Sequence, residues 1–148
     1  MDYDNTMPAD VRANGNACSW EERQRVTRST DAIVGVMQKS LANYDEKKFR
    51  KWFGKNNDKQ SDWMVKERIR NTYNFLKDGY ETKWTAICCK NAMGSCRTCG
   101  KNGVLAFVGG YSLGLGKKKS FTAMRLCPIL MKPGNPDMDI GLTILHEM

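Results

Sequence analysis

The residues best suited to chemistry lie at the end of the sequence, which reads LTILHEM from Leu142 to Met148. His146 is the only histidine of the chain, and Glu147 follows it directly in an apolar stretch. Zinc peptidases place two histidines one helical turn apart, so that both imidazoles reach one zinc ion, and the glutamate beside the first histidine acts as general base. His146 is therefore a candidate metal ligand and Glu147 a candidate general base. The second histidine would fall two residues after Met148, and on this dipeptide alone a helix-terminal histidine without a function is the simpler interpretation.

The cysteines form a second group with possible chemistry. They are even in number, with one distant member at each end: Cys18, Cys88, Cys89, Cys96, Cys99 and Cys127. An even set favours disulfides, and a bond from Cys18 to the middle of the chain would stabilise the fold by about 4 kcal/mol in the chain-entropy treatment. The alternatives are reduced thiols in a cytosolic protein, or a structural zinc held by the four cysteines of residues 88–99. Such a zinc knuckle in a basic protein would indicate nucleic-acid binding, but adjacent cysteines chelate one ion poorly.

A glycine-rich stretch, VLAFVGGYSLGLGKKKS, imitates a phosphate-binding loop. That motif requires four residues between its first glycine and a Gly-Lys pair, followed by serine or threonine. Here five residues separate Gly110 from Gly116, and Lys117 is followed by Lys118. The next residues, SFTAMRLC, alternate like a strand where the motif needs a helix N-terminus. We interpret residues 111–119 as a basic hairpin loop.

Composition is that of one domain. The chain has 148 residues, of which 41% are hydrophobic and 27% charged, and no apolar run is long enough for a membrane span. The formal net charge of +8 favours acidic partners, but its basic residues are scattered, which is typical of a basic surface. The polar N-terminus, MDYDNTMPADVRANGNA, is not a secretory signal, so the protein is either not exported or its leader lies outside this sequence.

The first half of the chain predicts helices. Ser19 and Glu22 form a capping-box pattern at the start of the first one. Apolar stripes predict core-facing sides for this helix, for a short helix over residues 45–54, and for a third from Ser61 to Gly79. Their members are Ile33, Val34, Met37, Leu41, Tyr44; Phe49, Trp52, Phe53; and Val65, Ile69, Tyr73, Leu76.

The second half predicts a small antiparallel sheet followed by a helix. Residues 81–88, 103–110 and 120–127 are rich in β-formers, and the second of these segments has the pattern of a buried strand. Three prolines in CPILMKPGNPDMD indicate a surface loop. Asp137 or Asp139 can then cap a last helix, which turns Ile140, Ile144 and Leu145 into the core. Helices followed by a small sheet indicate an α+β domain.

Several stretches in this order resemble a known family: NACSWEE, FRKWFG, NGVLAFV, RLCPILMKP and IGLTILHEM. The series is similar to the deuterolysin-like zinc endopeptidases, the aspzincins, which include the fungal peptidyl-Lys metalloendopeptidases. It runs from about Asn16 to the last residue. We expect residues 1–17 to be a flexible N-terminal segment. For residues 18–148 the resemblance implies the N-terminal portion of a secreted, disulfide-bonded peptidase domain ending in a zincin active-site helix. It further implies one zinc ion, protein or peptide substrates, a monomer, no membrane and no nucleic acid.

Carried over by position, the resemblance makes His146 the first zinc ligand, Glu147 the general base and Thr143 a structural residue. It also implies three disulfides. Cys18 would pair with Cys88 or Cys89, Cys96 would take the one that remains, and Cys99 would pair with Cys127.

The family completes its zinc site with residues that this chain lacks. These are the second histidine, an aspartate and a tyrosine of a downstream GTxDxxYG segment, and the residues that would direct cleavage to lysine. We therefore expect an incomplete zinc site, and no peptidase activity or tight zinc binding from the 148 residues alone.

Overall fold

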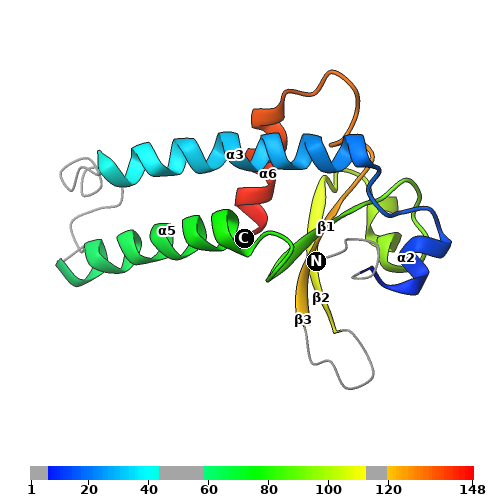
Figure 1. Ribbon diagram of the computed structural model, residues 1–148, viewed down its shortest axis with the longest axis horizontal. Coiled ribbons are helices and arrows are strands. Elements are labelled where there is room, and N and C mark those ends of the chain that lie inside the picture. The colour runs from blue at the N-terminus through cyan, green and yellow to red at the C-terminus, as the bar shows by residue number, and fades with distance from the viewer. Residues whose placement is uncertain (1–6, 44–58, 113–119) are drawn as a thin grey trace.

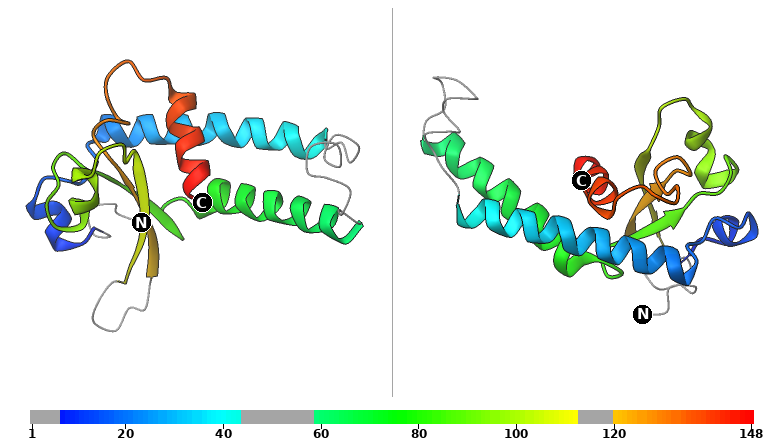
Figure 2. Two further views of the ribbon diagram at one scale, coloured as in Figure 1. Left: turned by 180° about the vertical axis from the view of Figure 1, so that it is seen from behind. Right: turned by 90° about the horizontal axis from the view of Figure 1, so that it is seen from above.

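The computed structural model describes residues 7–43, 59–112 and 120–148. Two long helices, α3 (Trp20–Ala42) and α5 (Lys59–Gly79), pack together to one side of a small sheet, and the short helices α2 (Ala9–Ala13) and η1 (Gly94–Gly100) lie to the other (Figure 1). The last helix, α6 (Asp137–Glu147), crosses α3 beside the sheet (Figure 2). The predicted α+β class is confirmed, whereas the helix expected over residues 45–54 and most of the expected basic loop lie outside the described residues.

Helix α3 begins as the sequence predicts. The Ser19 hydroxyl accepts a hydrogen bond from the Glu22 amide at 3.2 Å, and the Ser19 amide donates to the Glu22 carboxylate at 2.9 Å. These two bonds satisfy amide groups that have no partner within the helix. Ile33 and Met37 of the predicted stripe are buried.

Helix α5 ends at Gly79, also as predicted, and Leu76 of its stripe is fully buried. The Trp84 indole donates to the Phe75 carbonyl at 3.1 Å, which fixes the end of this helix against the first strand. Within residues 7–43, 59–112 and 120–148, every helix is too short or too polar to traverse a lipid bilayer.

The sheet has strands β1 (Trp84–Cys88), β2 (Ala106–Ser112) and β3 (Ser120–Leu126) in the order β1-β3-β2. The antiparallel pairing expected from the sequence holds for β2 and β3, but β1 runs parallel to β3. The sheet is therefore mixed, because the chain crosses from the end of β1 through η1 to the far side of β3 before it returns in the β2–β3 hairpin. Strand β1 also starts later than expected, after a turn in which Glu81 has a φ of 64°.

Strand β2 differs from the buried strand that the sequence predicted. It pairs with β3 alone among the described strands, so it is an edge strand, and Val108 is 44% exposed. An apolar run does not distinguish a central strand from an edge strand, because both bury one face.

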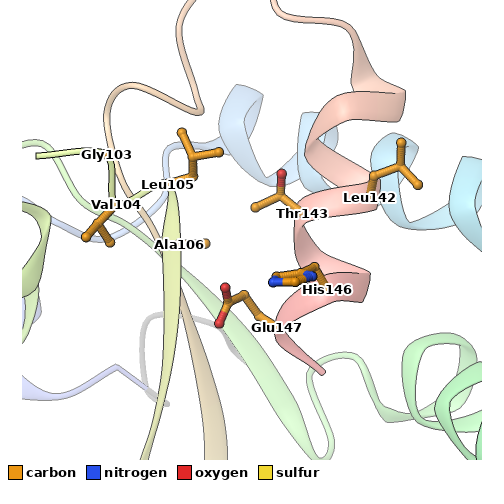
Figure 3. Close-up of a pocket in the computed structure, with 8 residues that line it drawn as sticks. All are labelled: Gly103, Val104, Leu105, Ala106, Leu142, Thr143, His146 and Glu147. Carbon is orange, nitrogen blue, oxygen red and sulfur yellow. The ribbon is translucent and has the colours of Figure 1, made fainter.

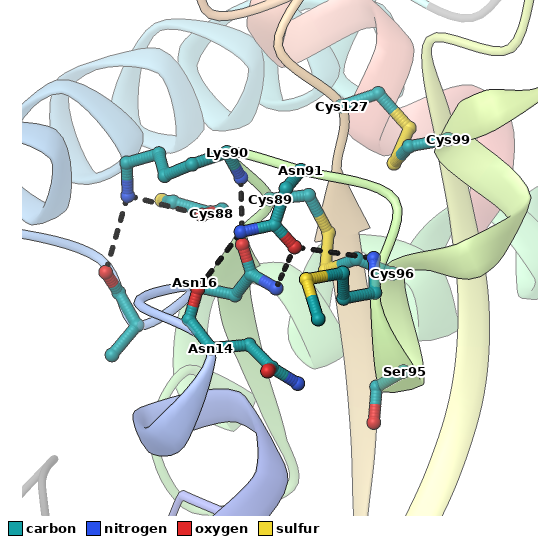
Figure 4. The surroundings of a disulfide bond; sticks show 12 residues. Asn14, Asn16, Cys88, Cys89, Lys90, Asn91, Ser95, Cys96, Cys99 and Cys127 are labelled. Atoms are coloured by element: carbon teal, nitrogen blue, oxygen red, sulfur yellow. Dashed lines mark hydrogen bonds between the residues drawn. A yellow bond between two sulfur atoms is a disulfide. The ribbon is translucent and has the colours of Figure 1, made fainter.

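All six cysteines form disulfides: Cys18–Cys88, Cys89–Cys96 and Cys99–Cys127. This is one of the two pairings that the family resemblance allowed, with Cys18 bonded to Cys88 and not to Cys89. Next to two of these bonds, the buried Asn16 side chain accepts from the Lys90 amide at 2.8 Å and donates to Asn91 at 3.1 Å (Figure 4). Disulfides and amide side chains together hold the segment before α3 against the end of β1.

Two predicted details of the chain differ from the structure. Residues 7–17, expected to belong to a flexible segment, contain α2 and pack on the domain, with Val11 only 1% exposed. Helix α6 begins at Asp137 after Pro136, and neither Asp137 nor Asp139 caps it with a side-chain hydrogen bond. Both aspartates instead lie in its first turn, where negative charge is favourable near the helix N-terminus.

Candidate active site

The two residues singled out by the sequence line a cleft of about 520 Å³ between α6 and the segment that leads into β2. We call it the α6–β2 cleft; its lining residues are Gly103, Val104, Leu105, Ala106, Leu142, Thr143, His146 and Glu147. Figure 3 shows the Thr143, His146 and Glu147 side chains on the side of α6 that faces β2. The volume is in the range of small-ligand sites in proteins.

Helix α6 buries one side in the core and turns the other side toward the cleft. Ile140 and Ile144 are fully buried, as predicted. Thr143 and Glu147 are spaced by four residues and are half-buried on the other side, and His146 is exposed. The Thr143 hydroxyl donates to the Asp139 carbonyl at 2.9 Å, within its own helix. His146 and Glu147 are thus the side chains of this wall that are available for chemistry.

The position of α6 depends on Arg25 of α3. Its guanidinium donates to three carbonyl groups of the loop before α6, those of Met131, Lys132 and Asn135, at 2.6, 2.9 and 2.7 Å. Asp137 in the first turn of α6 also accepts a hydrogen bond from Arg28 at 3.2 Å. Charge-assisted hydrogen bonds of this kind are the strong ones, so α3 fixes where α6 begins.

The crossing of the two helices is close because Gly141 has no side chain. A Cβ atom at this position would lie 2.5 Å from the Ser29 carbonyl oxygen and 3.3 Å from the Ile33 side chain. Ser29 is itself fully buried, and its hydroxyl donates to the Arg25 carbonyl at 2.7 Å. This contact sets how closely α6 packs against α3.

The opposite wall is held by a disulfide and a main-chain hydrogen bond. The Leu105 carbonyl accepts from the Cys127 amide at 2.9 Å, and Cys127 is bonded to Cys99 of η1. Before it, Gly103 has a φ of 80°, a conformation that favours glycine. The wall is therefore a fixed turn that leads into the free edge of β2.

The described residues do not by themselves compose a zinc site. Catalytic zinc takes three protein ligands and one open position, and the described ranges contain no group of three His, Cys, Asp or Glu side chains that could hold a metal ion. The α6–β2 cleft contributes one imidazole and one carboxylate. The zinc knuckle considered for residues 88–99 needs thiolates, and all four of its cysteines are in disulfides.

Comparisons with protein-family models, with curated proteins and with solved structures give no match to this chain.

The sequence pointed to one wall of the cleft and missed the other. It indicated the His146 side of α6 through a motif, but residues 103–106 contribute mainly backbone and apolar groups, which carry no motif. It also missed Arg25, because a lysine or arginine on a helix gives no sign of a carbonyl partner more than 100 residues away.

Proposed function

We propose that this chain is the N-terminal portion of a secreted zinc metalloendopeptidase similar to the aspzincins, with His146 as a zinc ligand and Glu147 as the general base. The observation that carries the proposal is the position of this His-Glu pair in the last turn of α6. There the pair lines a cleft whose opposite wall leads into an edge strand.

The roles of the residues follow from their positions. A bound zinc would lower the pKa of a water molecule and polarise the peptide carbonyl. The Glu147 carboxylate, half-buried in the cleft, would accept a proton from that water and later pass it to the leaving amine. The free edge of β2 offers backbone groups to an extended peptide, which could lie along it as an additional strand.

The remaining parts of the proposal rest on the family resemblance. The second histidine, the aspartate ligand and the residues that would direct cleavage to lysine are assigned to sequence after Met148. The 148 residues alone should therefore neither hydrolyse protein nor hold zinc tightly. Secretion is supported by the three disulfides, since such bonds persist in oxidising compartments.

The test uses the product of the complete reading frame. We expect it to cleave casein, to lose this activity with a chelator, and to regain it with zinc. Glu147→Gln should lower kcat by about 10²–10⁴-fold, the usual contribution of a general base. Glu21→Gln, at an exposed position of α3, is the matched control and should leave kcat unchanged. Equal activity of the two variants, or no zinc-dependent cleavage, would overturn the proposal.

The different-class alternative, a basic zinc-knuckle module that binds nucleic acid, requires free thiolates. A thiol titration under denaturing conditions distinguishes the two. The peptidase proposal expects no free thiols from the six cysteines, whereas the knuckle expects at least the four of residues 88–99.

A further inference from the structure

A buried cation lies on the face of the sheet opposite the α6–β2 cleft. Arg125 in β3 pairs with Phe107 of β2 and Ile87 of β1, and its side chain shares their face. The neighbouring positions in β2 and β3, Val108 and Met124, point the other way and line a pocket with Glu147. Arg125 is only 8% exposed.

In the described part of the chain, one buried nitrogen of this guanidinium has no acceptor. Its Nε atom is buried without a hydrogen-bond partner, and no ion pair joins it to a described carboxylate. The Phe107 ring lies beside it, with the ring centroid 5.7 Å from Cζ. Burial lowers the pKa of Arg125, while nearby Asp10 and Tyr111 act to raise it, and an arginine stays protonated in either case. A buried, charged donor without an acceptor is unfavourable, and a bound anion would supply the acceptor.

The small residues next to Arg125 in the sheet leave room for its guanidinium. A Cβ atom at Gly109 would lie 2.4 Å from Nη1 of Arg125, so glycine at this position is what allows the guanidinium to lie over β2. On the same face, Thr85 is 1% exposed and its hydroxyl also has no hydrogen-bond partner. Thr85, Ala123 and Gly109 are register partners with small side chains, and they form the floor beside Arg125.

We propose that Arg125 binds a carboxylate group of a small ligand at this face, independently of the α6–β2 cleft. A planar guanidinium donates two parallel hydrogen bonds to a carboxylate. The negative charge of Asp10 acts on Arg125 and repels a second anion there, and this repulsion is smaller for a ligand with one negative charge than for a ligand with two. A singly charged carboxylate therefore fits better than a doubly charged phosphate.

The test is an NMR titration of the 148-residue chain, disulfides intact, with sodium acetate at constant ionic strength. We expect saturable shifts of the Arg125 Nε–Hε resonance and of the amides of residues 107–109. Phosphate should bind more weakly, and chloride should give no saturation. Arg125→Met should weaken acetate binding about ten- to a hundred-fold, as expected for loss of a charged hydrogen-bond pair. Arg97→Met, at an exposed position of η1, should leave it unchanged.

A glycine pair gives a second test that keeps the charge. Gly109→Ala displaces the guanidinium and should reduce the acetate response. Gly110→Ala, whose Cβ would meet nothing closer than 3.8 Å, should retain it. A non-saturable response in the unaltered chain, an unchanged affinity in Arg125→Met, or equal affinities of the two alanine variants would each overturn the site. If Arg125→Met does not fold, the glycine pair and the Arg125 resonance decide the question.

Discussion

Gly141→Ala should separate α6 from α3 and disturb the α6–β2 cleft. The new Cβ atom would lie 2.5 Å from the Ser29 carbonyl oxygen, where ordinary contact begins near 3.4 Å. The backbone of α3 cannot rotate away as a side chain can. The two helices must therefore move apart by about 0.9 Å at the crossing, the difference between these two distances.

The magnitude follows from two opposing effects. Forcing an extra carbon into a packed interface costs about 1–3 kcal/mol. Replacing glycine by alanine inside a helix stabilises the folded state by about 1 kcal/mol, because alanine loses less backbone freedom on folding. The net loss should therefore be up to about 2 kcal/mol, which for a chain of this size lowers Tm by up to about 6 °C.

The assay is thermal unfolding with the disulfides intact, together with the NMR signals of His146, which are unambiguous because the chain has a single histidine. Gly35→Ala in α3 is the matched control, since a Cβ there would meet nothing within 4 Å. We expect it to raise stability by about 0.5–1 kcal/mol and to leave the His146 signals in place. The reasoning is refuted if Gly141→Ala stabilises the chain as Gly35→Ala does.

Three further substitutions test side chains whose hydrogen bonds stabilise the fold. Arg25→Met should speed amide exchange in α6 and leave α5 unchanged, because it removes the donors to the loop before α6; equal exchange in α6 would contradict this. Asn16→Ala leaves the Lys90 amide without its acceptor and removes one of the two donors to the Asn91 side-chain oxygen, so it should cost about 1–3 kcal/mol in a urea titration; an unchanged midpoint would refute this role of Asn16. Burial acts to raise the pKa of Glu22, but the Lys90 and Ser19 hydrogen bonds outweigh it and lower the pKa below the ordinary 4.5. Its stabilisation is therefore present above pH 4.5 and is lost as the pH falls through the folded pKa, so Glu22→Gln should flatten the acid limb of the stability profile; an unaltered acid limb would count against it.

The sequence predicted correctly those features that depend only on residues within one helix or strand. The capping box of Ser19 and Glu22, the end of α5 at Gly79 and the buried side of α6 all depend on residues within one or two turns. The same holds for the strand character of residues 120–127, most of which form β3.

Features that join distant segments were not predictable in this way. The parallel pairing of β1 with β3 depends on how the chain crosses the sheet, which no residue of either strand encodes locally. The partners of Arg25 lie beyond residue 130. That the Arg125 Nε atom has no hydrogen-bond partner among the described residues is visible only once three strands are in register. In the candidate site, a motif marked His146 and Glu147, but the backbone wall that completes the cleft has no sequence signature.

The most direct test of the central claim is the sequence of the transcript after the codon for Met148. If His146 and Glu147 are half of a zinc site, the second codon after Met148 should encode histidine, and a GTxD segment should follow further downstream. Any other residue at that position, or a stop codon directly after Met148, would contradict the assignment of His146 as a zinc ligand.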